Sequence, residues 1–175
     1  MSELLDLEYQ LAIYKAYHLH PKNVVIHLFF IPMIFYTAAV MLGAVQVGSF
    51  TAADIGSFGY GIYYTLLHAK VGLTADAILV SIIATVHYFY DNFSRSQILY
   101  PALVLHITGW AFQFWGHYYY EKKRPALIDN LAQPLVLAPY FVLWELVFAF
   151  GFEKDLKTKM EKRAKQLRPP DKPKQ

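Results

Sequence analysis

The feature that most constrains this chain is a series of long apolar stretches with almost no basic side chains among them. Only two of its 16 Lys and Arg residues, Lys70 and Arg95, lie between Val24 and Tyr120. A helix needs about 20 mostly apolar residues to cross a bilayer, and the chain offers that length several times. Charged residues make up 17% of the chain, whereas soluble domains carry roughly 25%. The sequence therefore predicts an all-α, multi-pass transmembrane helical bundle.

Four of these stretches have the length and composition of spanning helices. We expect the spans at about 24–47, 52–69, 72–90 and 98–120. A fifth apolar stretch, 131–152, is interrupted by Pro134, Pro139 and Glu145. The prolines and the carboxylate favour a re-entrant hairpin, because both disfavour a continuous helix in lipid. A fifth span is the alternative.

The first twenty residues predict a short amphipathic helix rather than a cleaved signal peptide. Apolar side chains recur there at three- and four-residue spacing with polar side chains between them, which suits a helix on the membrane or against the bundle. These apolar positions are Leu4, Leu7, Leu11 and Tyr14. The helix should stop before Pro21, because a proline disfavours helical geometry in the preceding residue. Pro21 can then begin the next helix.

The basic residues gather in three places and indicate the orientation of the bundle. Nine of the 16 follow Gly151, three occupy positions 122–124, and Lys15 and Lys22 precede the first span. Cytoplasmic segments of membrane proteins carry an excess of Lys and Arg. We therefore expect all three basic regions, and both termini, to lie in the cytosol.

The length of 175 residues suits one domain. We expect one membrane-embedded domain over 1–152 and a basic cytosolic tail over 153–175, solvated and drawn to anionic headgroups. No nucleic-acid partner is expected, because no basic surface with interleaved aromatic residues is evident. The chain contains no cysteine, which excludes disulfides, thiolate catalysis and Cys-ligated metal centres.

Four of the seven histidines are expected to meet at the cytosolic face of the bundle. His18 and His20 precede the first span, His27 lies about two turns after Pro21, and His117 lies in the last turn of the fourth span. Glu121 follows His117 by one turn on the same helix face. Imidazole with carboxylate suits iron or zinc. We predict a metal site of His18, His27 and His117, with His20 and Glu121 as further candidate ligands.

This grouping depends on a turn in the chain. His18 and His27 are nine residues apart and would point to opposite faces of one continuous helix, so they can share a metal ion only if the chain turns at Pro21. The remaining histidines, which we expect to be helix caps or interfacial residues, are His68, His87 and His106.

The residues alone leave three functions open. One is a metal-dependent enzyme. A second is a haem protein with His27 and His117 as axial ligands, and a third is a non-catalytic scaffold or transporter. The histidine clusters of membrane desaturases, the phosphate loop and the nucleophile elbow of hydrolases are all absent from the sequence.

Two stretches of the sequence carry specific motifs. The first reads YKAYHLHPKN over 14–23, followed by Ile26-His27 and Ile31-Pro32. The second contains Gly109-Trp110, Gln113-Phe114, Gly116-His117, Glu121, RPALIDN over 124–130, and Ala138-Pro139. From about Leu5 to Gly151 the chain resembles the fungal 2-hydroxy fatty acid dioxygenase family.

The resemblance implies an enzyme of fatty acid α-oxidation in the endoplasmic reticulum membrane. Such an enzyme uses Fe(II) and O₂ to remove the carboxyl carbon of a 2-hydroxy fatty acid, a step in the breakdown of sphingolipid long-chain bases. The resemblance implies that His18, His27 and His117 are its catalytic iron ligands. Lys123 or Arg124 could hold the substrate carboxylate. The aromatic residues expected beside the acyl chain are Phe29, Phe30, Phe112 and Trp115.

Overall fold

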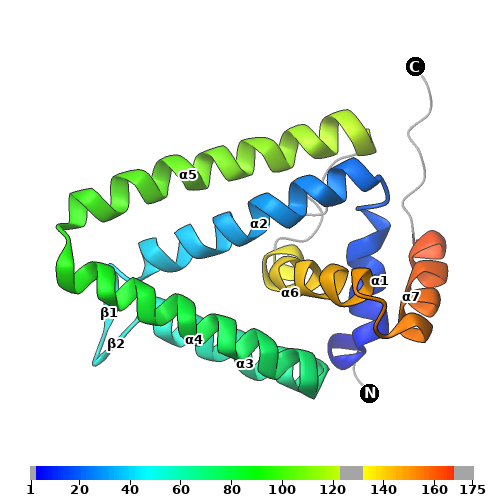
Figure 1. Cartoon of the computed structure of the whole chain (residues 1–175), viewed down its shortest axis with the longest axis horizontal. Coiled ribbons are helices and arrows are strands. Elements are labelled where there is room, and N and C mark those ends of the chain that lie inside the picture. Colours follow the sequence, from blue (N-terminus) through cyan, green and yellow to red (C-terminus); the bar gives the residue numbers. More distant parts are fainter. Residues whose placement is uncertain (1–2, 123–131, 168–175) are drawn as a thin grey trace. The chain divides into compact units, whose positions relative to one another are not determined.

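The computed structural model describes residues 3–122 and 132–167, and within these ranges the chain is all-α with seven α-helices (Figure 1). The helices are α1 (Leu7–Ala16), α2 (Pro21–Leu42), α3 (Ala52–Leu67), α4 (Ala69–Asn92), α5 (Arg95–Gly116), α6 (Ala132–Ala149) and α7 (Lys154–Leu167). Short elements complete the order: a 3₁₀ turn, Glu3–Leu5, a two-stranded hairpin, β1 (Gln46–Val47) and β2 (Phe50–Thr51), and a π-helical turn, η2 (His117–Glu121). The predicted all-α class is confirmed.

The chain forms two units. The terminal unit contains Met1–Phe29 and Phe112–Gln175, and the central unit contains Phe30–Ala111.

The central unit contains an antiparallel pair of helices, α3 and α4. A capping box begins α3, since the Thr51 side chain accepts from the Asp54 N–H and the Asp54 side chain accepts from the Thr51 N–H. His68 separates the two helices, and its Nδ1 accepts from the Val71 N–H at the start of α4. The predicted capping role of His68 is confirmed.

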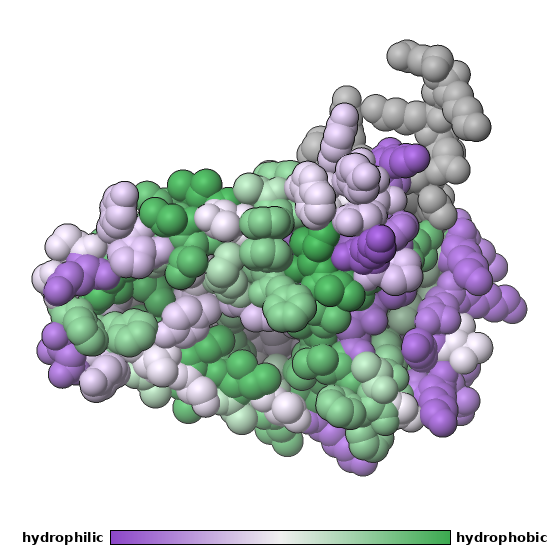
Figure 2. Space-filling view, turned by 45° about the horizontal axis from the view of Figure 1, so that its top comes forward, coloured by the Kyte–Doolittle hydropathy of each residue, from purple (hydrophilic) through white to green (hydrophobic). Residues whose placement is uncertain are grey.

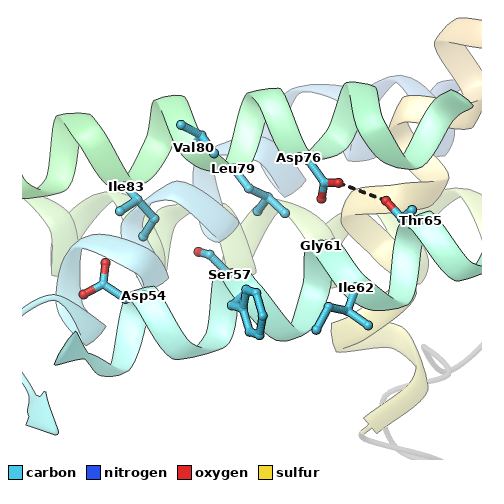
Figure 3. Close-up of a pocket in the computed structure, with 10 residues that line it drawn as sticks. Asp54, Ser57, Gly61, Ile62, Thr65, Asp76, Leu79, Val80 and Ile83 are labelled. Atoms are coloured by element: carbon cyan, nitrogen blue, oxygen red, sulfur yellow. Dashed lines mark hydrogen bonds between the residues drawn. The ribbon is translucent and has the colours of Figure 1, made fainter. Parts of the chain in front are cut away.

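A pocket lies between α3 and α4, and Figure 3 shows its lining. Most of the lining is apolar, and its two carboxylates already have partners. Asp76 accepts a hydrogen bond from Thr65 Oγ1 (2.9 Å), and Asp54 lies 2.9 Å from His87 Nε2. This pocket therefore offers no unpaired carboxylate for a ligand.

In the terminal unit, α1 packs against α6 and α7. Its core contains the fully buried side chains of Leu11, Tyr140, Phe141, Trp144 and Met160. The buried face of α7 consists of Met160 and Ala164, whereas its lysines face outward and give the hydrophilic colour of this helix in Figure 2. The sequence analysis expected a solvated tail here and did not predict this helix.

Contacts of Arg163 attach α7 to the start of α1. Its guanidinium lies 3.2 Å from Asp6 and 3.5 Å from Glu8, and it stacks over the Tyr9 ring at 4.6 Å. Exposed ion pairs of this kind each contribute about 0–1 kcal/mol. The burial of Met160 therefore contributes more to the docking of α7 than these charges do.

The fifth apolar stretch forms one helix, α6, so the predicted hairpin is wrong for the described residues. Pro139 lies inside α6, where it removes one backbone donor, but the buried side chains of Tyr140, Phe141 and Trp144 hold the helix in place. Glu145 does not break the helix either, because its carboxylate pairs with Lys15 of α1 at 2.7 Å.

Two of the described helices, α2 and α4, are long and apolar enough to cross a membrane. Many large apolar side chains of the central unit are also exposed, including Phe58 (73%), Val80 (69%) and Ile107 (60%). Apolar residues accordingly cover much of the face seen in Figure 2. Contiguous apolar surface of this kind is expected where a protein contacts lipid or a partner.

Candidate metal centre

The terminal unit brings together the three histidines that the sequence analysis grouped. His18 lies between α1 and α2, His27 lies on α2, and His117 begins η2. One ring nitrogen from each lies within 4.8 Å of those of the other two, and all three side chains are buried. The ring centroids are 4.3 Å apart for His18 and His27, 4.7 Å for His18 and His117, and 4.9 Å for His27 and His117.

The predicted turn before Pro21 is confirmed, and it explains how His18 and His27 meet. Helix α1 ends at Ala16 and α2 begins at Pro21, whose missing N–H is not needed at the first helical position. The non-helical segment between them breaks the helix, and the His18 ring lies against the ring of His27 on α2. A continuous helix would point His18 and His27 to opposite sides.

Backbone hydrogen bonds fix which nitrogen of two histidines carries the proton. Nδ1 of His18 lies 2.8 Å from the Tyr14 carbonyl oxygen, and Nδ1 of His27 lies 2.8 Å from the Asn23 carbonyl oxygen. A carbonyl oxygen can only accept, so each Nδ1 is the N–H donor. Each Nε2 therefore keeps a free lone pair, as in histidines that bind metal ions in proteins.

His18 is held in its neutral form. Burial lowers the pKa of His18 well below its usual value, and the neighbouring His27 and His117 lower it further. The Tyr14 ring stacks on His18 at 4.1 Å and excludes water from one face. Because a metal ion binds the neutral imidazole, His18 is available as a ligand at neutral pH.

His117 is placed by a local change in helix geometry. The α5 helix ends at Gly116 and the chain continues as the π-helical turn η2, a feature that often occurs at functional sites. Nδ1 of His117 is buried and has no hydrogen-bond partner among the described residues. A buried polar atom without a partner is costly, and a metal ion or ligand would relieve that cost.

The donor set fits a metal ion. Two nitrogens bound to one ion at about 2.1 Å each lie at most about 4.2 Å apart, so the three imidazoles need movements on the order of 1 Å or less to share an ion. Buried neutral imidazoles suit zinc or iron. The three histidines can therefore hold one metal ion.

His20 and Glu121 are not part of this cluster of ligand atoms. Glu121 Oε1 accepts from the His20 backbone N–H at 2.9 Å and from Asn23 Nδ2 at 3.1 Å. His20 Nδ1 accepts from the Lys22 N–H at 3.2 Å, so this side chain caps the start of α2. Glu121 thus joins the end of η2 to the start of α2, the elements that carry His117 and His27.

Asn23 was not among the site residues predicted from the sequence. This residue is fully buried, and it holds two parts of the site at once: its backbone carbonyl accepts from His27 and its side chain donates to Glu121. One signal was available. Asn23 lies four residues before His27, and residues at that spacing share a helix face.

The remaining candidates lie apart from the cluster or beyond the described residues. His87 pairs with Asp54, and His106 contacts Thr37 and Trp110 at 2.9 Å each. The candidate carboxylate-binding residues, Lys123 and Arg124, fall outside the residues that the structure describes.

The fold and the site define a helical protein with a buried three-histidine centre that can hold a metal ion. The chain belongs to the Mpo1-like family, described as 2-hydroxy-palmitic acid dioxygenase Mpo1-like, whose model matches residues 4–150. The 2-hydroxy-palmitic acid dioxygenase MPO1 of Saccharomyces cerevisiae is 42% identical over 160 residues, which cover 90% of this chain and 89% of the yeast protein. No solved structure matches the chain. The family resemblance found in the sequence is confirmed.

The Glu121 network gives a first prediction. Replacing Glu121 with alanine leaves the His20 N–H and the Asn23 amide without their acceptor, so we expect metal affinity to fall by about 10–100-fold. Metal titration of the detergent-solubilised protein measures this.

Glu121→Gln serves as the matched variant, because its amide oxygen can still accept both hydrogen bonds. It should keep most of the affinity. Equal losses in both variants would show that the charged carboxylate itself binds the ion, against the positioning role.

Proposed function

We propose that this chain is a non-haem Fe(II)-dependent dioxygenase. It converts a 2-hydroxy long-chain fatty acid and O₂ to the fatty acid one carbon shorter. The observation that carries the proposal is the buried cluster of His18, His27 and His117 in a chain that is 42% identical to a 2-hydroxy-palmitic acid dioxygenase.

His18, His27 and His117 would hold the iron. Ferrous iron bound there supplies the capacity to activate O₂ for oxidative cleavage of the bond between C1 and C2. The protein contributes three neutral imidazoles in fixed orientation, two of them set by carbonyl hydrogen bonds. It also excludes bulk water, since all three histidines are buried and Tyr14 covers one face of His18.

Three of the aromatic residues expected beside the acyl chain are exposed in the terminal unit. Phe29 is 74% exposed, Phe112 42% and Trp115 46%. Within the described residues these side chains lie on the surface and do not enclose a tunnel. We propose that the acyl chain stays largely in the lipid, while the polar head of the substrate reaches the histidines. Lys123 or Arg124 would assist at the carboxylate.

The proposed location is the endoplasmic reticulum membrane, in sphingolipid long-chain base breakdown. The proposed topology has four spans, with both termini cytosolic, a catalytic domain over 1–152 and a basic segment over 153–175 whose helix α7 packs on α1. The two long apolar helices and the placement of the Lys and Arg residues support it.

The haem alternative fits the site poorly. A haem with axial His27 and His117 needs a planar macrocycle between the two rings. Their centroids are only 4.9 Å apart, and the His18 ring packs against both. The buried side chains therefore occupy the space that the macrocycle requires.

Oxygen uptake by the purified, iron-loaded protein tests the proposed function. We expect iron-dependent uptake with 2-hydroxypalmitic acid and at least about 100-fold less with palmitic acid, since a site built for a hydroxyl discriminates strongly against its absence. Mass spectrometry should detect the acid one carbon shorter. With O₂ as the only oxidant, the atoms balance when the lost carbon leaves as CO₂ together with one water.

Two outcomes would reject this function. One is the absence of oxygen uptake by protein that contains iron. The other is equal uptake with the hydroxylated and unhydroxylated acids.

A further inference from the structure

Three buried polar atoms without hydrogen-bond partners in the described part of the chain gather at the end of α5. They are Gln113 Nε2, His117 Nδ1 and Asn23 Oδ1, and the last of these lies against Gly116. Native structures leave few buried polar groups unpaired, and each needs an explanation. Their concentration beside the histidine cluster indicates that a polar ligand belongs here.

Two of the three atoms have an explanation within the site. His117 Nδ1 belongs to a candidate metal ligand. Asn23 Oδ1 occupies the space beside Gly116 where another residue would have a Cβ, while the nitrogen of the same amide donates to Glu121. Packing therefore accounts for the position of Asn23. Gln113 is left without any such account.

Gln113 lies on the face of α5 that meets α2. It precedes Gly116 by three residues and His117 by four, and residues at these spacings are neighbours on a helix surface. Gly116 faces Asn23, and the His117 ring contacts that of His27. The Gln113 side chain is 5% exposed, so it places a buried amide one turn from the histidine cluster.

The chemistry of the unpaired atom limits what it can bind. An amide N–H₂ group is a donor and cannot bind a metal cation. It suits an oxygen acceptor, and it is strongest with a charged one. In the proposed reaction, the substrate brings a carboxylate to the histidine cluster.

We propose that Gln113 binds the substrate headgroup, with its Nε2–H donating a hydrogen bond to the carboxylate of the 2-hydroxy fatty acid. This assignment rests on the proposed function and adds to it a residue that selects the acid end of the substrate. The pairing satisfies the buried donor and orients C1 and C2 beside the three histidines.

The test is substrate binding to the iron-loaded protein without O₂, so that no turnover occurs. Gln113→Met keeps the length of the side chain and removes the donor. We expect its affinity for 2-hydroxypalmitic acid to fall by about 10–100-fold, the usual effect of losing a hydrogen bond to a charged group, with iron content unchanged. Palmitic acid, which keeps the carboxylate, should lose affinity by the same factor.

Gln10→Met is the matched control. Gln10 is also a buried glutamine, but its Nε2 donates to the Glu3 carbonyl oxygen at 2.8 Å, so its loss should leave substrate affinity unchanged. Wild-type affinity in Gln113→Met would overturn the assignment while leaving the proposed function intact. A loss confined to the hydroxylated acid would also overturn it, because the amide would then bind the hydroxyl. Tight binding by wild-type protein that consumes no O₂ would reject the function and keep the subsite.

Discussion

Replacing His117 with alanine is expected to abolish iron binding and oxygen consumption together. Only two imidazoles would remain to bind the ion. Metal affinity should therefore fall by more than about 100-fold, which exceeds the loss expected for a residue that only supports a ligand, such as Glu121. The same result is expected for His18→Ala and His27→Ala, because each ring contacts the other two. Iron content and oxygen uptake, measured on the same purified sample, check the prediction.

His87→Ala is the matched control. The His87 side chain is 51% exposed and pairs with Asp54, outside the cluster. It should keep iron and activity. Circular dichroism of each variant tests whether the helices remain intact. Full iron content and activity in a folded His117→Ala protein would contradict the three-histidine centre.

The histidine grouping could be predicted because it depends on local rules and chain direction. Proline ends one helix and begins the next, which places His18 beside the start of α2. Placing the basic regions on one side of the membrane, as the Lys and Arg bias indicates, then predicts that the residues that begin α2 meet those that end α5. Neither step requires knowledge of side-chain packing.

The residues that support the site and the fold could not be predicted, because each acts through a contact with a helix that is distant in the sequence. The contact of Asn23 with Glu121 joins residues 98 positions apart. Helix α7 packs against α1 and buries Met160, although most residues of α7 are charged. Glu145 predicted an interruption of the fifth apolar stretch, but its carboxylate pairs with Lys15 and the helix is continuous. For α7 and for Glu145, a tertiary contact overrides the local preference of the sequence.

Gly116 has no functional group, but its lack of a side chain lets Asn23 pack closely against it. A Cβ at this position would overlap Asn23 Oδ1 and lie 3.2 Å from the Ile26 side chain. Asn23 cannot easily move away, because it is fully buried and its amide donates to Glu121. Overpacking of this kind costs about 1–3 kcal/mol. We expect Gly116→Ala to separate His27 from His117 and lower iron affinity about 10–100-fold.

Gly59→Ala provides the control, since a Cβ at Gly59 meets no atom within 4 Å. It should leave iron affinity unchanged. Normal iron affinity in Gly116→Ala would show that the spacing of α2 and α5 does not set the geometry of the centre.

A double variant tests whether Gly116→Ala lowers iron affinity by changing the spacing of α2 and α5 or by disturbing the hydrogen bond between Asn23 and Glu121. Asn23→Ser removes the atom that a Cβ at position 116 would strike, but it also removes the amide that donates to Glu121. If steric overlap is the cause, Gly116→Ala should lower iron affinity much less in the Asn23→Ser background than in the wild type. Contacting residues of this kind show coupling energies of about 0.5–3 kcal/mol. Simple additivity of the two effects would mean that Gly116 acts through something other than its contact with Asn23.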